Sequence, residues 1–217
     1  GDLVAVVGIP EANQAREDFA RIVRIEERRN SLTRSAEDGS ERVLVANIDY
    51  LAIVSATENP EPKHGFVNRA LVAAYAEGIT PILVMTKSDL ASASEFLATY
   101  NAIEVPSFQL RKDQTPLEFI KFIEGKVTVL IGHSGVGKST LLLAAAHAYA
   151  QSGGRTVLYI SGEESARQVG SRAQRLGAQH QSLQLATSNS ANDIAATMTG
   201  GSYQLVIVDS IQAVTLA

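Results

Sequence analysis

Short apolar runs rich in β-branched residues recur along the chain, separated by longer segments of helical composition. The runs YLAIVSA (residues 50–56), PILVMT (81–86) and VTVLI (127–131) have the near-continuous hydrophobicity of strands that are buried on both faces. Helical segments are expected between them, at about 66–77, 93–100 and 115–124. This β-α-β-α order predicts an α/β fold, a three-layer sandwich in which helices cover both faces of a mostly parallel sheet.

The first 48 residues have a different texture. LVAVV (3–7), ARIVRI (20–25) and RVLVAN (42–47) are predicted to be short strands, and the polar PEANQAREDF between the first two predicts an insertion with one helical turn. Arginines in this segment are interleaved with Glu and Asp. We favour a solvated strand face for this pattern over an RNA-binding patch, and both readings stay open.

The strongest motif lies at the centre of the chain, where the strand at 127–131 leads into GHSGVGKST and an Ala/Leu-rich helix. Gly132, Gly137, Lys138 and Ser139 fit G-x-x-x-x-G-K-[ST], the phosphate loop. Glycines let backbone N–H groups converge on a phosphate at a helix N-terminus. Lys138 would reach the β- and γ-phosphates and Ser139 would bind Mg²⁺. The predicted nucleotide-binding residues of this loop are Gly132, His133, Ser134, Gly135, Val136, Gly137, Lys138, Ser139 and Thr140.

A second motif follows the strand at 81–86, where TKSD occupies a strand's carboxyl end. Asp89 could accept hydrogen bonds from the N1–H and N2–H₂ groups of guanine, while Thr86 and the stem of Lys87 flank the base. Ser107, after the next strand, is a further candidate for contact with the base. The alternative for Lys-Ser-Asp is a helix cap.

LVIVDS places Asp209 at the end of another apolar strand, the Walker B pattern. Its carboxylate would hold the Mg²⁺ shell together with Ser139. The alternative is a helix N-cap after a buried strand.

The composition of the chain mainly rules out certain kinds of binding site and location. The 217 residues contain no cysteine, so disulfides and thiolate metal sites are ruled out. No apolar run approaches the ~18 residues of a membrane span and the start lacks a basic signal-peptide region, so we expect a cytoplasmic protein without a membrane partner. A net charge of −4 argues against binding nucleic acid by overall attraction.

VLVANIDYLAIVSA, TKSDL after PILVM, and VTVLIGHSGVGKST, in that order, resemble the RsgA family of circularly permuted GTPases of small-subunit ribosome assembly. Ordinary GTPases carry the phosphate loop before the base-reading motif, and here the order is reversed. The resemblance covers about residues 1–140. It implies that residues 1–48 are part of an OB-like β domain, that residues 49–217 form the P-loop domain, that GTP is the ligand, and that the 30S ribosome or its rRNA is a partner.

Beyond Thr140 the GTPase family's switch threonine and D-x-P-G motif do not follow. GGRTVLYISGEES and LVIVDSIQ instead resemble RadA, the RecA-like ATPase family of DNA repair, over about residues 138–217. That resemblance implies that Glu163 orients the attacking water, and that ATP or DNA could bind. For Glu163, a first-turn acidic residue favoured by the helix dipole is the alternative.

We therefore expect a chimera of two P-loop families joined near residues 138–143, engineered or recombined. It would bind GTP with Mg²⁺ and hydrolyse it weakly or not at all, with Lys138 and Glu163 as the catalytic candidates. The alternatives are an ATPase module of the RadA class and a fragment chimera with only residual nucleotide binding. We also expect either the strand at 50–56 or the Walker B strand to fill the position beside the phosphate-loop strand.

Overall fold

The computed structural model describes residues 2–7, 21–35, 39, 41–112, 114–153, 155–210 and 213–215. The predicted polar insertion at 10–19 lies outside these residues. The chain divides into two compact units. The first comprises residues 1–53, 63–82 and 125–131, and the second comprises residues 54–62, 83–124 and 132–217.

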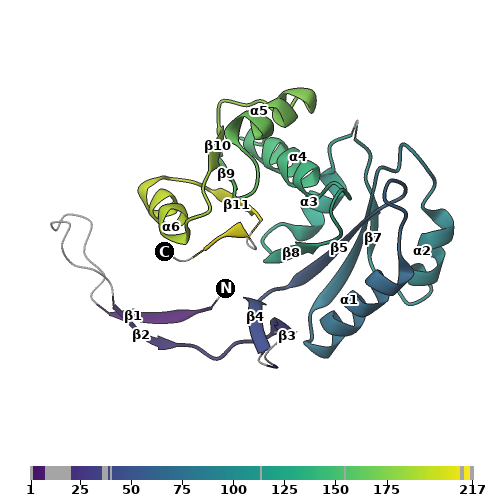
Figure 1. Cartoon of the computed structure of the whole chain (residues 1–217), viewed down its shortest axis with the longest axis horizontal. Helices are drawn as coiled ribbons and strands as arrows, with labels where there is room; N and C mark the ends of the chain where they lie inside the picture. Colours follow the sequence, from purple (N-terminus) through teal and green to yellow (C-terminus); the bar gives the residue numbers. More distant parts are fainter. Residues whose placement is uncertain are drawn as a thin grey trace. The chain divides into compact units, whose positions relative to one another are not determined.

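The first unit begins with two antiparallel strand pairs (Figure 1). β1 (Val4–Val7) pairs with β2 (Arg21–Ile25), and β3 (Ser31–Ser35) pairs with β4 (Glu41–Ala46). Three of these strands were expected. β3 was missed because its sequence, SLTRS, has only one apolar residue.

Arginines of this segment are held by carboxylates. Arg24 pairs with Glu26 at 2.6 Å, Arg28 with Asp2 at 2.6 Å and Arg29 with Asp49 at 3.0 Å. The hydrogen bond from Arg28 holds the pKa of Asp2 below its usual value. These pairs are solvent-exposed and each stabilises the fold little, but they favour the solvated strand face over an RNA-binding patch.

A sheet with the order β7-β6-β5-β8 follows. β5 (Tyr50–Ala56) is parallel to β8 (Thr128–Ile131), and β6 (Thr80–Thr86) is parallel to β7 (Ser107–Gln109). In the first unit, α1 (His64–Ala76) buries residues at helical spacing, namely Val67, Ala70, Leu71 and Ala74. In the second, α2 (Ser94–Asn101) and α3 (Leu117–Ile123) flank β7 in the chain. The predicted α/β fold with a parallel sheet, preceded by small antiparallel strands, is confirmed.

A separate parallel sheet lies within the second unit, in the order β10-β9-β11. Its central strand is β9 (Val157–Ser161), flanked by β10 (Leu183–Thr187) and β11 (Leu205–Asp209). Figure 1 shows α4 (Lys138–Gln151) and α5 (Ala166–Arg175) beside this sheet, and α6 (Ala191–Gly200) precedes β11 in the chain. Leu143 and Ala146 of α4 pack with Tyr159 of β9 and Val169 of α5 in one buried cluster.

The neighbours of β8 answer the question of strand order. β5 is hydrogen-bonded to β8, as one alternative required, whereas the Walker B strand β11 pairs with β9. The prediction that one of these two strands lies beside the phosphate-loop strand is confirmed, and among the described residues β8 ends its sheet. The backbone partners available to β11 explain this result, since it runs in register with β9 over its whole length, from Leu205↔Val157 to Asp209↔Ser161.

Asn30 provides a test of how the first unit is held together. Its buried side chain donates to the carbonyl of Ile48 and accepts from the N–H of Ile48, both at 2.9 Å. Asn30→Ala leaves two backbone groups unpaired and should lower the free energy of unfolding by about 1–3 kcal/mol. Urea denaturation measures this change. Gln174→Ala, at an exposed helix position, is the control and should stay within about 0.5 kcal/mol of the parent.

Candidate functional site: a phosphate loop beside the TKSD turn

The phosphate loop connects β8 to α4, and its glycines are required by space and by backbone conformation. A Cβ on Gly132 would lie 2.4 Å from the carbonyl oxygen of Val54. Gly135 and Gly137 have φ of +80° and +95°, a region that L side chains rarely adopt. Gly137 caps α4 without a side-chain hydrogen bond, which leaves the first N–H groups of this helix to a ligand. The loop therefore has the conformation that phosphate binding needs.

Lys138, the first residue of α4, folds back over this loop. Its Nζ donates to the carbonyl of Gly132 at 2.6 Å and to that of His133 at 3.0 Å. Burial lowers the pKa of Lys138, and the charges of Asp209 and Glu163 oppose that shift. The predicted residues Lys138, Asp209 and Glu163 are thus brought within electrostatic reach of one another, and half-buried Ser139 follows Lys138 in the first turn.

Asp209 ends β11, and its carboxylate is already engaged. The hydroxyl of Tyr159, a fully buried residue of β9, donates to Oδ2 of Asp209 at 2.5 Å. Burial, with the bond to Asp209 second, raises the pKa of Tyr159. Glu163 accepts a hydrogen bond from Ser210. Tyr159 was not foreseen, because only the register of β9 with β11 brings the two residues together.

The TKSD motif lies at the end of β6, and Thr86 ties it to the phosphate loop. Its hydroxyl lies 2.5 Å from the carbonyl oxygen of Val136 and 3.3 Å from that of Ser55. Lys87 has φ of +58°, its carbonyl accepts from the hydroxyl of Thr57 at 2.6 Å, and its Nζ donates to the carbonyl of Asn59. The backbone of the base-reading loop is therefore fixed by side-chain contacts.

Asp89 is exposed in the turn that follows, and its Oδ1 accepts from the backbone N–H of Lys112 at 3.4 Å. The helix-cap alternative for this motif is wrong, because α2 begins at Ser94 with Ala93 at its N-cap. Ser107 stands at the start of β7, where its hydroxyl donates to Asn101 at 3.2 Å.

One cavity of about 270 Å³ joins the two motifs. This volume is close to the ~300 Å³ at which typical ligand pockets begin. Thr86 and Lys87 of the predicted base-reading loop line it together with Gly137 and Thr140 of the phosphate loop. Ser107 is not part of its lining. The remaining lining residues are Leu110, Arg111, Lys112, Gln114, Pro116, Leu141, Ala144, Arg172, Arg175 and Leu176.

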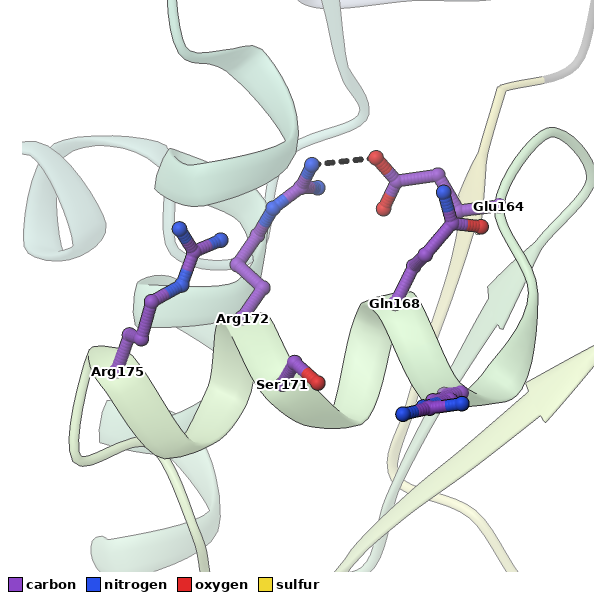
Figure 2. Close-up of a pocket in the computed structure, with 6 residues that line it drawn as sticks. Glu164, Gln168, Ser171, Arg172 and Arg175 are labelled. Atoms are coloured by element: carbon purple, nitrogen blue, oxygen red, sulfur yellow. Dashed lines mark hydrogen bonds and ion pairs between the residues drawn. The ribbon is translucent and has the colours of Figure 1, made fainter.

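A second, open cavity of about 290 Å³ lies along α5, lined by Glu164, Arg167, Gln168, Ser171, Arg172 and Arg175. Figure 2 shows Arg172 and Arg175 extending from the same side of α5, with Arg172 paired to Glu164. The arginines of α5 were not among the predicted site residues, and no local motif marks them.

The described residues contain no cluster of three or more His, Asp or Glu that could hold a metal ion. They also contain no helix that is long and apolar enough to cross a membrane. The hydroxyl of Ser139 and the second oxygen of Asp209 are the hard oxygen ligands that suit Mg²⁺. A magnesium ion here would complete its shell with phosphate oxygens and water.

Comparison with known families decides the affiliation. A family model described as the RsgA GTPase matches residues 25–164, more than half of the chain. The chain belongs to the RsgA GTPase family. A model described as the ABC transporter matches residues 119–212, so the part of the chain beyond the RsgA match also resembles a second P-loop family.

Relatives of the RsgA family agree with this assignment. The small ribosomal subunit biogenesis GTPase RsgA of Paraburkholderia phytofirmans is 37% identical over 134 residues, which cover 58% of this chain and 42% of that protein. RsgA of Ralstonia nicotianae is 40% identical over 133 residues, covering 58% and 41%. The chain therefore spans about two-fifths of the length of these relatives.

Two solved structures share the fold. YjeQ from Thermotoga maritima has a TM-score of 0.53 at 24% identity, covering 67% of this chain and 50% of that one. YloQ, described as a circularly permuted GTPase, has a TM-score of 0.51 at 24% identity, covering 70% and 50%. These likenesses show a shared fold.

The hydrogen bond between Tyr159 and Asp209 can be tested by a double-mutant cycle. Tyr159→Phe removes a buried hydrogen bond to a charged group and should lower the free energy of unfolding by about 1.5–3 kcal/mol. In an Asp209→Asn background the same change should cost clearly less, since the charge is gone. Tyr149→Phe is the control and should be nearly neutral. Equal costs in both backgrounds would mean that the two side chains are not coupled.

Proposed function

We propose that this chain is a GTP-binding module of the RsgA family that holds GTP and Mg²⁺ on its phosphate loop and acts with the small ribosomal subunit. The observation that carries the proposal is the single cavity shared by Gly137 and Thr140 of the phosphate loop and by Thr86 and Lys87 of TKSD. The relatives named as small-subunit biogenesis GTPases support the ribosomal partner.

Lys138 changes partners when GTP binds. Its ammonium leaves the carbonyls of Gly132 and His133 and takes the β- and γ-phosphate oxygens, which are stronger acceptors because they are charged. The loop carbonyls keep Lys138 over the loop before the ligand arrives, so little side-chain entropy is lost on binding. The N–H groups at the start of α4, which have no cap, take further phosphate oxygens.

We assign magnesium binding to Ser139 and Asp209. Tyr159 acts as a positioning residue, since its hydroxyl holds the carboxylate of Asp209. Because Tyr159 occupies Oδ2, the other oxygen is directed to the metal shell. Guanine preference is assigned to Asp89, with Lys87 and Thr86 beside the base and Ser107 as a more remote candidate.

Hydrolysis is proposed to be weak. The sequence after Thr140 lacks the switch threonine and the D-x-P-G motif, so Glu163 remains as the group to orient water, and it accepts a hydrogen bond from Ser210. Multiple-turnover GTPase rates should fall below about 1 s⁻¹, the lower end of typical kcat values. Phosphate release under saturating GTP and Mg²⁺ measures this rate, and Lys138→Ala supplies the background.

The origin of the C-terminal part belongs to the same proposal. The likeness of residues 138–217 to RadA, and the ABC transporter match over 119–212, support an ATPase-like continuation joined at the phosphate-loop helix. We propose a chimera with its seam at about 138–143, and domains at 1–48 and 49–217. ATP binding and a DNA partner are the rival outcome that this origin predicts.

Nucleotide choice separates the rivals. Fluorescent GTP and ATP analogues are titrated against the parent and against Asp89→Asn. We expect the parent to prefer GTP, and Asp89→Asn to lose that preference by about tenfold or more, since a paired carboxylate is replaced by a group that cannot accept both guanine donors.

Lys138→Ala is the matched control and should abolish binding of both analogues. Equal binding of GTP and ATP by the parent, unaffected at Asp89, would favour the ATPase reading. Failure of both analogues to bind would leave a fold without nucleotide function.

A further inference from the structure

Arg172 of α5 has an unmet hydrogen-bonding group. Its Nη2 pairs with a carboxylate oxygen of Glu164, whose backbone N–H is fixed in turn by the hydroxyl of Ser161 at 2.9 Å. Its Nη1 is buried and has no hydrogen-bond partner in the described part of the chain. Leaving a buried donor unpaired is unfavourable, because it has given up its hydrogen bonds to water. Arg172 also lines the cavity shared by the two motifs, so an acceptor oxygen bound there would lie beside this guanidinium.

The cavity that Arg172 lines is strongly cationic, although the chain as a whole carries a net charge of −4. Among the residues that the structure describes, no carboxylate lines it. Its positively charged residues are Lys87, Arg111, Lys112, Arg172 and Arg175. Arg175 makes no ion pair with any described residue. Such a wall suits an anion, because hydrogen bonds from cationic side chains to anionic oxygens are charge-assisted and therefore stronger than neutral ones.

The place of the cavity limits which part of a nucleotide lies there. Gly137 and Thr140 line it, whereas Lys138 and Ser139, the groups assigned to the terminal phosphates and the metal, do not. Thr86 and Lys87 of the predicted base-reading loop also line it, and Thr86 lies beside Gly137. The portion of a nucleotide between the terminal phosphates and the base is the ribose with its α-phosphate.

We propose that Arg172 and Arg175 bind the α-phosphate and ribose of the nucleotide, so that α5 supplies one wall of the site. The inference rests on the proposed function and deepens it. Glu164 acts as a positioning residue that keeps the guanidinium of Arg172 at the cavity before the ligand binds. The part of the chain beyond the RsgA match at residue 164 thereby contributes to binding, not only to packing.

The test compares Arg172→Gln and Arg175→Gln with Arg167→Gln, an exposed arginine of the same helix that lines only the second cavity. Affinities for GTP and GDP are measured by competition with a fluorescent GTP analogue. Each of the first two changes should weaken GTP and GDP by the same factor, about tenfold, since both ligands carry the α-phosphate. Arg167→Gln should stay within about twofold of the parent.

Three results would overturn the inference. Affinities of the Arg172 and Arg175 variants equal to that of Arg167→Gln, in a parent that binds GTP, would remove these arginines from the site. Loss of GTP affinity alone would place them at the γ-phosphate. Failure of the parent itself to bind GTP would contradict the proposed function, and with it the inference that rests on it.

Folding is checked separately, by thermal melting of each variant. If Arg172→Gln melts early, Arg172→Lys and Glu164→Gln replace it. We expect Arg172→Lys to restore part of the affinity, and Glu164→Gln to weaken GTP and GDP equally but less than Arg172→Gln does. Parental affinity in Glu164→Gln would contradict the positioning role.

Discussion

The close approach of the phosphate loop to the strand ends of the same unit is the constraint on which the site depends. Gly132 leaves no room for a Cβ against the carbonyl of Val54, and Thr86 bonds the carbonyl of Val136. Since Thr86 also begins TKSD, one hydroxyl fixes the phosphate-binding and base-reading loops to each other. This contact explains how two motifs separated by some fifty residues can line one cavity.

The charged groups of the site influence one another's pKa values. Lys138 is partly desolvated, which on its own would favour its neutral form, and Asp209 and Glu163 counteract this. Asp209 is in turn held by Tyr159, a residue whose pKa is raised because both burial and the neighbouring carboxylate disfavour its ionised form. Burial therefore lowers the pKa of Lys138, and the nearby carboxylates of Asp209 and Glu163 reduce that shift. Packing alone therefore does not determine the pKa of Lys138.

Local chemistry made much of this readable from the sequence. The phosphate loop, TKSD and the Walker B strand are short motifs that can be recognised from their glycines, lysine and carboxylates, and the apolar runs predicted β5, β6 and β8 nearly to the residue. The failures have a common cause. The division into two sheets, the partnership of Tyr159 with Asp209, and the entry of Arg172 into the cavity all depend on which strand pairs with which, and no short pattern specifies that choice. The prediction missed β3 for a different reason. Its residues are mostly polar and show no strand pattern, so only its pairing with β4 defines it as a strand.

Binding and turnover draw on different parts of this structure. Most groups assigned to nucleotide binding lie in the phosphate loop, at the start of α4 and at the end of β6, within residues 25–164 that match the RsgA family. Asp209, Arg172 and Arg175 lie beyond that match. Turnover requires a water placed in line with the γ-phosphate, and the residue available for it, Glu163, lies at the end of β9 in a sheet whose register is set by β10 and β11. The helix that begins at the phosphate loop connects these two parts, because Leu143 and Ala146 of α4 pack with Tyr159 of β9. The weak hydrolysis proposed above would therefore follow from the GTPase motifs that are missing after Thr140, and not from a lack of contact between the loop and the β10-β9-β11 sheet.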